Sequence, residues 1–221
     1  RHDLLVVEDN AQAIGACSSV AGFSGAYTTG ALGHAAAFSF YPTKNIGALG
    51  DAGAVTTDDE ELAATVRALA NYGSRARYIN IYEGYNCRLD PLQAAFLNVK
   101  LDHLPEENSR RRRLASVYDA AITHPDVRRP SVTDGSVWHQ YVVRVQDRDA
   151  FRSYLEASGV GTDVNYPTPP HLQPCYSRFS HLDLPVAQEL ARTVVCLPVS
   201  SATSPDDARA IANIINDYRP C

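Results

Sequence analysis

The chain has 221 residues, of which 45% are hydrophobic and 20% are charged, the balance of an ordinary globular protein rather than a disordered one. Its formal net charge of -5 argues against a nucleic-acid partner, because binding to a phosphate backbone normally needs a concentrated basic surface. The basic run at residues 110–113 is a local exception. Four consecutive arginines spread around a helix, so we expect a solvated face with some acidic or subunit pairing.

No apolar stretch approaches the roughly 20 residues that span a bilayer, and the first residues lack the pattern of a signal peptide. We therefore expect a cytoplasmic protein without a membrane partner. The cysteines are odd in number and scattered without CxxC spacing, which predicts free thiols and no metal site. They are Cys17, Cys87, Cys175, Cys196 and Cys221.

The first half of the chain has the pattern of an open α/β sheet. Residues 4–8 form a continuous apolar run, which predicts a parallel strand covered on both faces, and Asp9 follows at its carboxyl end. The next expected elements are strands near residues 36–39 and 54–57 and helices near residues 58–71, 90–101 and 105–122. The helix near 90–101 has an apolar stripe made of Leu89, Leu92, Ala95, Phe96 and Val99.

A proline-rich, polar stretch at residues 124–136 is the best candidate for a domain boundary. We expect a partial large domain at residues 1–123 and a small domain at residues 124–221. The second is expected to contain strands near 140–145 and 194–197, helices near 149–158 and 205–218, and an irregular segment at 166–171. The predicted fold class is α/β with a mixed, mostly parallel sheet.

Lys44 lies on a loop after a buried strand, and Asp9 ends a neighbouring strand. A lysine amine and a nearby carboxylate are the minimal equipment for Schiff-base chemistry on pyridoxal phosphate, whose pyridine nitrogen needs an acidic partner. Each residue also has an ordinary structural explanation, since an aspartate after a strand often caps a helix and a loop lysine is usually solvated.

Five segments in chain order resemble one known family. They are residues 7–13 (VEDNAQA), 38–45 (FSFYPTKN), 47–51 (GALGD), 71–74 (NYGS) and 84–90 (GYNCRLD). Together they resemble the DegT/DnrJ/EryC1/StrS sugar aminotransferases, fold-type-I pyridoxal phosphate enzymes that act on nucleotide-linked keto-sugars. Residues 84–97 and 166–176 look most like the enzymes that aminate C3 of dTDP-3-keto-6-deoxyhexoses.

The resemblance implies a cofactor site. Lys44 would form the Schiff base and transfer protons, and Asp9 would face the pyridine nitrogen. Gln12 would contact the phenolic oxygen or the ring, and Ser39 would bind the phosphate. Asn86 would reach the phosphate of a neighbouring subunit, which makes a homodimer with shared active sites part of the expected mechanism.

The resemblance also suggests substrate contacts. Arg88 is a candidate clamp for the carboxylate of L-glutamate, because a guanidinium can bind a carboxylate bidentately. His139 could line the sugar site or be a satisfied core histidine. Tyr166 and His171 lie among prolines on a rigid loop, which could position them for the sugar or could serve only the fold. Asn165 stands where many relatives carry histidine, so no role is assigned to it.

The expected activity is transfer of an amino group from L-glutamate to a nucleotide-linked, dTDP-type keto-deoxysugar in amino-sugar biosynthesis, through pyridoxal and pyridoxamine phosphate. The family usually has a long portion ahead of Leu4, so the resemblance implies that the N-terminal part is missing. A non-catalytic module that pairs with a complete subunit is therefore an alternative. An aminotransferase for a cyclitol or an aminobenzoate is another, whereas a related sugar dehydratase is disfavoured because it lacks the lysine.

Overall fold

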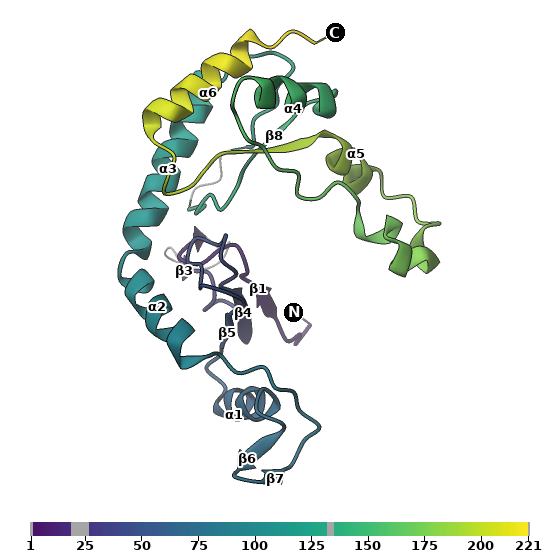
Figure 1. The fold of residues 1–221 in the computed structure, drawn as a ribbon. Helices are drawn as coiled ribbons and strands as arrows, with labels where there is room; N and C mark the ends of the chain where they lie inside the picture. Colours follow the sequence, from purple (N-terminus) through teal and green to yellow (C-terminus); the bar gives the residue numbers. More distant parts are fainter. Residues whose placement is uncertain (1, 19–26, 132–134, 221) are drawn as a thin grey trace. The chain divides into compact units, whose positions relative to one another are not determined.

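The computed structural model describes residues 2–18, 27–131 and 135–220. The chain divides into two compact units, whose ribbon is coloured along the sequence in Figure 1. Unit 1 consists of Arg1–Ser109 with Thr133–His139, and unit 2 consists of Arg110–Val132 with Gln140–Cys221. Both units contain helices and strands, which agrees with the predicted α/β class.

A three-stranded sheet forms the centre of unit 1, in the order β1 (Val7–Asp9), β4 (Ala35–Ser39), β5 (Gly53–Thr56). β1 pairs with β4 in parallel, with Asp9 opposite Ala37, and β5 pairs with β4 antiparallel. The sheet is therefore mixed, and the carboxyl ends of β1 and β4 lie at the same edge. In open α/β sheets this edge is where ligands bind.

The other elements of unit 1 are short paired strands and helices. They are β2 (Cys17–Ser18), β3 (Tyr27–Thr28), α1 (Glu60–Leu69), β6 (Ser74–Ala76), β7 (Ile79–Asn80), α2 (Pro91–Asp102) and the start of α3 (Leu104–Ala121). Helix α1 begins where the Asp59 carboxylate accepts the N–H of Leu62 at 2.9 Å, and α2 begins at Pro91, whose fixed φ suits a first helical position. Both helices confirm the sequence prediction.

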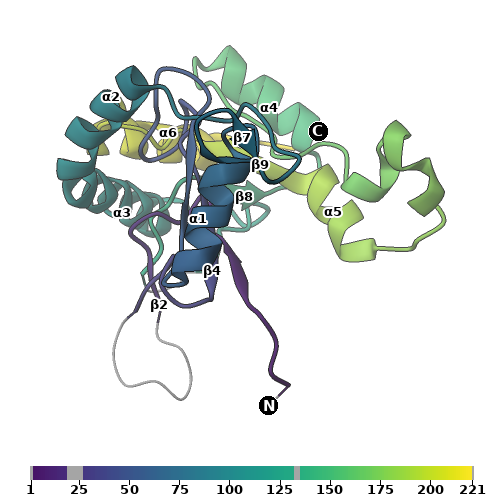
Figure 2. The ribbon, with the colours of Figure 1, turned by 90° about the horizontal axis from the view of Figure 1, so that it is seen from below.

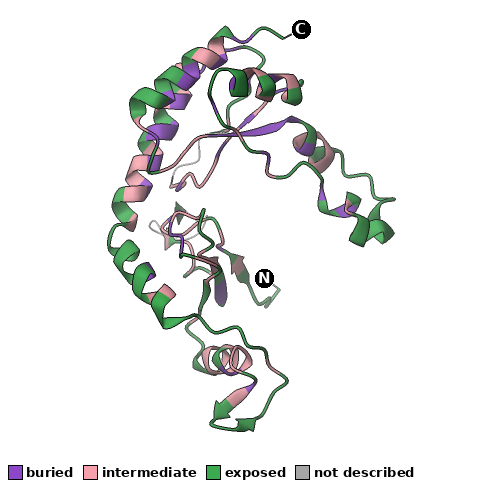
Figure 3. Ribbon diagram, viewed as in Figure 1, coloured by how far each residue is buried: buried purple, intermediate pink, exposed green. Residues whose placement is uncertain are grey.

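The apolar run at residues 4–8 is not buried, contrary to the prediction from its pattern. Leu4, Leu5 and Val7 are 71%, 82% and 71% exposed, and β1 begins only at Val7. Figure 3 shows this segment as exposed. β1 is an edge strand, and nothing in the described part of the chain covers these side chains. An apolar pattern indicates what a strand can bury, but burial requires a covering element.

Helix α2 buries a different side from the one its apolar stripe predicts. Leu92, Phe96 and Val99 are 68%, 42% and 63% exposed. Leu97 is 4% exposed instead, and it packs in a cluster with Ile46, which lies on the loop after β4. The stripe therefore forms exposed apolar surface on unit 1 rather than part of its core.

The centre of unit 2 is an antiparallel pair of strands, β8 and β9, in which Val143 lies opposite Val195 and both are 0% exposed. Its elements are β8 (Tyr141–Arg144), α4 (Arg148–Ala157), α5 (Pro185–Thr193), β9 (Val194–Leu197), α6 (Pro205–Asp217) and 3-10 turns at Pro170–Leu172 and Pro174–Phe179. Figures 1 and 2 show α6 beside the second half of α3. The strands and helices α4 and α6 confirm the prediction, whereas α5 was not expected.

The observed division falls at Ser109 and Arg110, within helix α3, rather than at the expected position between residues 123 and 124. The reason lies in the second half of α3, which packs into unit 2. Leu114 and Tyr118 are 0% exposed, and the Tyr118 hydroxyl donates to the carbonyl of Pro198 at 2.9 Å. A proline-rich stretch predicts a boundary from composition, but the packing of a helix decides which unit it joins.

The arginine run at residues 110–113 is only partly the solvated face that the sequence predicts. Arg111 is 6% exposed, and its guanidinium donates to the carbonyl of Val199 at 3.0 Å. Arg110 donates to the carbonyl of Thr203 at 3.3 Å. Both arginines thus tie α3 to the segment after β9 within unit 2.

Cys17, Cys87, Cys175 and Cys196 are free thiols, as expected, whereas Cys221 lies outside the described residues. Burial raises the pKa of the Cys196 thiol. Among the described helices, none is long and apolar enough to cross a membrane.

Candidate functional site

Asp9 and Ser39 lie at the carboxyl ends of the adjacent parallel strands β1 and β4. The pairing ends where the N–H of Asn10 donates to the carbonyl of Ala37 at 2.9 Å. Asp9 is exposed, and one of its carboxylate oxygens accepts the N–H of Ala11 at 3.1 Å. This local bond orients the carboxylate, while the other oxygen has no partner among the described residues and is available to a ligand.

Lys44 lies on a tight turn directly after β4. Its N–H donates to the carbonyl of Tyr41 at 2.9 Å, and the chain returns where the N–H of Ala48 donates to the carbonyl of Phe40 at 2.8 Å. The turn needs glycine at position 47, because a Cβ there would lie 2.1 Å from the carbonyl oxygen of Pro42. Within the described chain, the Lys44 amine has no hydrogen bond or ion pair, so no interaction must be broken before it contacts a ligand.

Gln12 and His139 lie on segments close in structure to these residues. Gln12 is exposed on the loop that follows Asp9. The Nδ1 atom of His139 lies 3.2 Å from the Oδ1 atom of Asn45, which is the residue after Lys44. The structure therefore brings His139 to the Lys44 turn. An orienting role for that histidine fits this contact at least as well as direct contact with a sugar.

Glu8 holds a loop beside the candidate site, a role that the sequence pattern did not indicate. Its carboxylate accepts the N–H groups of Gly30 at 2.8 Å, Leu32 at 2.7 Å and Gly33 at 2.8 Å. Burial acts to raise the pKa of this carboxyl, but the three N–H donors outweigh it and hold the pKa below its ordinary value. Glu8 thereby fastens the loop before β4 to the strand that ends in Asp9. No local sequence signal identifies this contact, since its partners lie more than twenty residues away.

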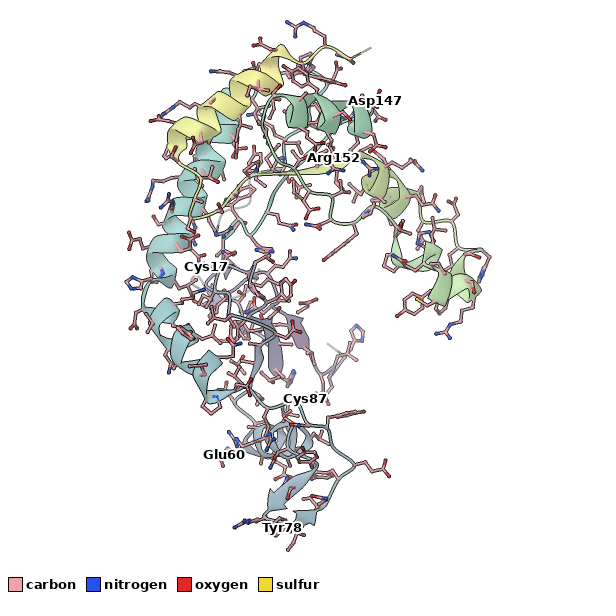
Figure 4. All side chains as sticks on the ribbon, viewed as in Figure 1. Cys17, Glu60, Tyr78, Cys87, Asp147 and Arg152 are labelled. Carbon is pink, nitrogen blue, oxygen red and sulfur yellow. The ribbon has the colours of Figure 1, made fainter. Side chains whose placement is uncertain are left out.

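Asn86 and Arg88 lie on a segment that is tied to the end of α1. Cys87, which is labelled in Figure 4, lies between these two residues in the sequence. Its N–H donates to the carbonyl of Ala70 at 2.9 Å. The Arg88 guanidinium lies 5.5 Å from the ring centre of Tyr72, and it donates to the side-chain oxygen of Asn71 at 3.4 Å. These contacts run to the end of α1 rather than to the Lys44 turn.

Tyr166 and His171 belong to unit 2, whereas the other candidates belong to unit 1. His171 is 6% exposed, and its Nε2 atom lies 3.2 Å from the Nε2 atom of Gln188. This contact and its burial favour a structural role. Tyr166 is 69% exposed and lines a pocket of about 520 Å³ with Gln173 and Tyr176. Tyr166 is thus accessible to a small molecule.

The side chains at the strand ends fit the chemistry of pyridoxal phosphate. The cofactor offers an aldehyde, a basic ring nitrogen and a phosphate. Lys44 supplies a primary amine, Asp9 a carboxylate with one oxygen uncommitted, and Ser39 a hydroxyl at the end of β4. The three groups come from one edge of one sheet, so the donor set matches the three functional groups of the cofactor.

Comparisons with known proteins identify the family of this chain and several relatives. A model of the DegT/DnrJ/EryC1/StrS aminotransferase family matches residues 1–216. The dTDP-3-amino-3,6-dideoxy-alpha-D-galactopyranose transaminase of Aneurinibacillus thermoaerophilus is 44% identical, over 99% of this chain and 59% of that relative. The UDP-N-acetyl-3-dehydro-alpha-D-glucosamine 3-aminotransferase of Acidithiobacillus ferrooxidans is 37% identical, over 97% of this chain and 57% of the relative. The chain thus spans somewhat over half the length of these curated relatives.

Solved structures are similar over the same extent. The structure of S. venezuelae DesV in complex with a ketimine intermediate has a TM-score of 0.86 and 39% identity, and the similarity covers 98% of this chain and 58% of that one. The structure of Bacillus subtilis ntda with bound PMP has a TM-score of 0.83 and 28% identity, covering 97% of this chain and 51% of that one.

Proposed function

Because this chain belongs to the DegT/DnrJ/EryC1/StrS aminotransferase family, we propose that it carries the cofactor site of a pyridoxal phosphate-dependent aminotransferase for nucleotide-linked keto-sugars. The observation that carries the proposal is the position of Lys44 on the turn after β4, next to a parallel strand that ends in Asp9. Unit 1 corresponds in this proposal to a partial large cofactor-binding domain, and unit 2 to the small C-terminal domain.

When bound, the cofactor would supply an electron sink for the carbon that loses or gains the amino group. Lys44 holds the cofactor through its amine and moves a proton as general acid and base. Asp9 keeps a proton on the ring nitrogen by placing a negative charge beside it. Ser39 donates to the phosphate, and Gln12 contacts the ring or its phenolic oxygen.

The proposed substrate is a dTDP-linked deoxysugar, with L-glutamate as the amino donor. The relative named for a dTDP-sugar is 44% identical to this chain, compared with 37% for the relative named for a UDP-sugar. Arg88 is the proposed clamp for the donor carboxylate, and its exposed position leaves it accessible. Of the three expected sugar contacts, Tyr166 is the one that we propose, because it is exposed, whereas His171 is buried and His139 contacts Asn45.

We also propose a homodimer in which Asn86 serves the neighbouring subunit's phosphate. Asn86 is exposed and lies on a segment anchored by backbone bonds to α1, which suits a residue that acts outside its own unit. The exposed free thiols Cys17 and Cys87 suit a reducing, cytoplasmic setting.

A non-catalytic partner module is the second candidate function. It is favoured by one observation, namely that unit 1 exposes apolar side chains such as Leu5 and Leu92, which are 82% and 68% exposed. Such a module would pair with a complete subunit through the exposed apolar residues of unit 1. Such a module would have no need for the features of the candidate site. These are the Lys44 amine with no hydrogen bond or ion pair in the described chain, the oriented Asp9 carboxylate, and the turn that requires Gly47.

The two candidates separate in one experiment. The purified chain is mixed with pyridoxal phosphate, its visible spectrum is recorded, and the adduct is reduced with borohydride and located by peptide mapping. The chain contains two lysines, Lys44 and Lys100, so Lys44→Arg and Lys100→Arg form a matched pair. Lys100 donates to the carbonyl of Gly47, a bond that arginine can also make.

The proposed enzyme gives a yellow adduct mapped to Lys44 that is lost in Lys44→Arg and kept in Lys100→Arg. No adduct in the wild-type chain, with folding verified by circular dichroism, would favour the partner module. An adduct that maps equally to both lysines would mean unspecific modification and would refute the assignment of Lys44.

A further inference from the structure

Helix α3 carries a buried amide, Asn108, that contacts two loops of the candidate site. Asn108 is 2% exposed. Its Nδ2 atom donates to the carbonyl of Ile14 at 3.0 Å, and its Oδ1 atom accepts from the Nδ2 atom of Asn45 at 2.8 Å. Ile14 lies on the loop that leaves Asp9, and Asn45 is the residue after Lys44. One side chain therefore bonds to both catalytic segments.

Asn45 extends the contact to a third segment. Its Nδ2 atom also donates to the carbonyl of Val137 at 3.0 Å, and its Oδ1 atom lies 3.2 Å from Nδ1 of His139. All of these residues belong to unit 1, so the network lies within one compact body. The Lys44 turn is thus fixed through both the nitrogen and the oxygen of the Asn45 side chain, in addition to its own backbone hydrogen bonds.

Asn108 lies so close to the loop after Asp9 that position 15 has no room for a side chain. Gly15 has a φ of +76°, and a Cβ at this position would lie 2.7 Å from the Nδ2 atom of Asn108. A buried amide that loses its partners is costly, because neither water nor an apolar neighbour replaces the bonds. The bonds to Asn45 and Ile14 therefore define the separation between the two loops rather than merely accompany it.

We propose that Asn108 is a positioning residue that sets the Lys44 turn relative to the loop leaving Asp9. This inference rests on the proposed function, since it assigns the amine and the carboxylate to one cofactor. Asn108 itself touches neither group. It acts through Asn45 on the turn and through Ile14 on the Asp9 loop, and it holds both in the absence of any ligand.

The test compares the full chain with Asn108→Ala, Asn108→Asp, Asn45→Ala and the double alanine variant. Asn108→Asp keeps the acceptor for Asn45 but puts a carboxylate oxygen against the carbonyl of Ile14, so it breaks one arm only. Asn213→Ala is the matched control, because Asn213 is exposed on α6 in unit 2. Two quantities are measured: the dissociation constant for pyridoxal phosphate from its visible spectrum, and amide hydrogen exchange at residues 41–48 without cofactor.

We expect Asn108→Ala and Asn45→Ala each to weaken cofactor binding about tenfold, and the double variant to weaken it by less than the product of the two effects, because the bond between Asn108 and Asn45 is lost in both. Exchange at residues 41–48 should accelerate in both single variants and stay unchanged in Asn213→Ala. Asn108→Asp should weaken binding with a smaller acceleration at residues 41–48, since its bond to Asn45 is kept.

Additive effects of Asn108→Ala and Asn45→Ala, or unchanged exchange at residues 41–48 in Asn108→Ala, would overturn the positioning role. Loss of folding in one alanine variant leaves Asn108→Asp to decide, because cofactor affinity equal to wild type in that variant also refutes the proposal. A wild-type chain that takes no cofactor on Lys44 would refute the proposed function. In that case the exchange data still decide whether Asn108 fixes the turn.

Discussion

Two short apolar runs with similar sequence patterns have opposite surroundings in this molecule. In unit 2, all residues of β9 (Val194–Leu197) are buried, and Val195 is 0% exposed. In unit 1, the run at residues 4–7 is exposed along its whole length. β9 lies in a unit whose helices bring Leu155 and Ile215 to full burial, whereas residues 4–7 lead into an edge strand. The comparison teaches that unit 2 covers its own strands, while unit 1 combines the candidate chemistry with uncovered apolar surface.

The largest expected effect is chemical and concerns unit 1 alone. Lys44→Ala should lower amino-group transfer by about 1,000-fold or more, because both covalent attachment and proton transfer need the amine. Stability should hardly change, since the Lys44 side chain makes no hydrogen bond or ion pair within the described chain. Turnover of a dTDP-keto-sugar with L-glutamate is the measurement, and a thermal melt is the control. Substantial remaining turnover would refute the role of Lys44.

A matched pair of leucines tests the burial contrast directly. Leu155→Ala in unit 2 should lower the free energy of unfolding by about 3 kcal/mol, because it leaves a cavity at a 0% exposed position. Leu5→Ala in unit 1 should change it by less than about 0.5 kcal/mol, since Leu5 is 82% exposed. Urea denaturation of both variants gives the two values. Equal losses would mean that residues 4–7 are covered in solution, for instance by a second copy of the chain.

Glu8→Gln tests how much a polar contact contributes to the stability of unit 1. Loss of the charged acceptor should cost about 2 kcal/mol at pH 7, because three N–H groups lose an ionised partner. The pKa of Glu8 is lowered in the fold, so its contribution is present above the ordinary glutamate value of 4.5 and is lost as the pH falls through the folded pKa. The difference in the free energy of unfolding between wild type and Glu8→Gln should therefore shrink as the pH is lowered.

The control for this substitution is Glu61→Gln. Glu61 is ionised in a surface pair with Arg75, and exposed pairs contribute little to stability. Urea melts at pH 7 and at pH 4 should separate the two glutamates. If Glu8→Gln lowers the free energy of unfolding by the same amount at both pH values, the charge of the Glu8 carboxylate does not contribute to stability.

A helix cap of unit 2 should have a smaller effect than Leu155→Ala or Glu8→Gln. The Ser204 hydroxyl accepts the N–H of Asp207, while the Asp207 carboxylate accepts from Ser204, which forms a capping box at the start of α6. Ser204→Ala should cost about 1 kcal/mol. The hydrogen bonds from Ser204 lower the pKa of Asp207, so the cap should weaken as the pH falls below its ordinary value of 3.8. Urea denaturation at pH 7 and at low pH measures both effects. A loss of stability in Ser204→Ala larger than that in Leu155→Ala would show that the cap contributes more to the stability of unit 2 than the buried core does.

The sequence by itself determined the order of the elements and the residues of the candidate chemistry. An apolar run followed by Asp9, and a strand followed by a loop with Lys44, place a carboxylate and an amine at strand ends, because strands and turns are encoded by local side-chain chemistry. The starts of α1 and α6 were equally predictable from the sequence, since Asp59 and Ser204 cap their helices through hydrogen bonds to residues three positions away.

Only the tertiary structure decided which of these residues are covered, paired or linked. The network of Asn45 and Asn108 joins residues 63 positions apart, and Glu8 reaches residues 22 to 25 positions away. His171 proved buried against Gln188, and α2 turned Leu97 inward instead of its apolar stripe. Burial and long-range hydrogen bonds depend on which surfaces meet when the chain is folded, and no local pattern of side chains contains that information.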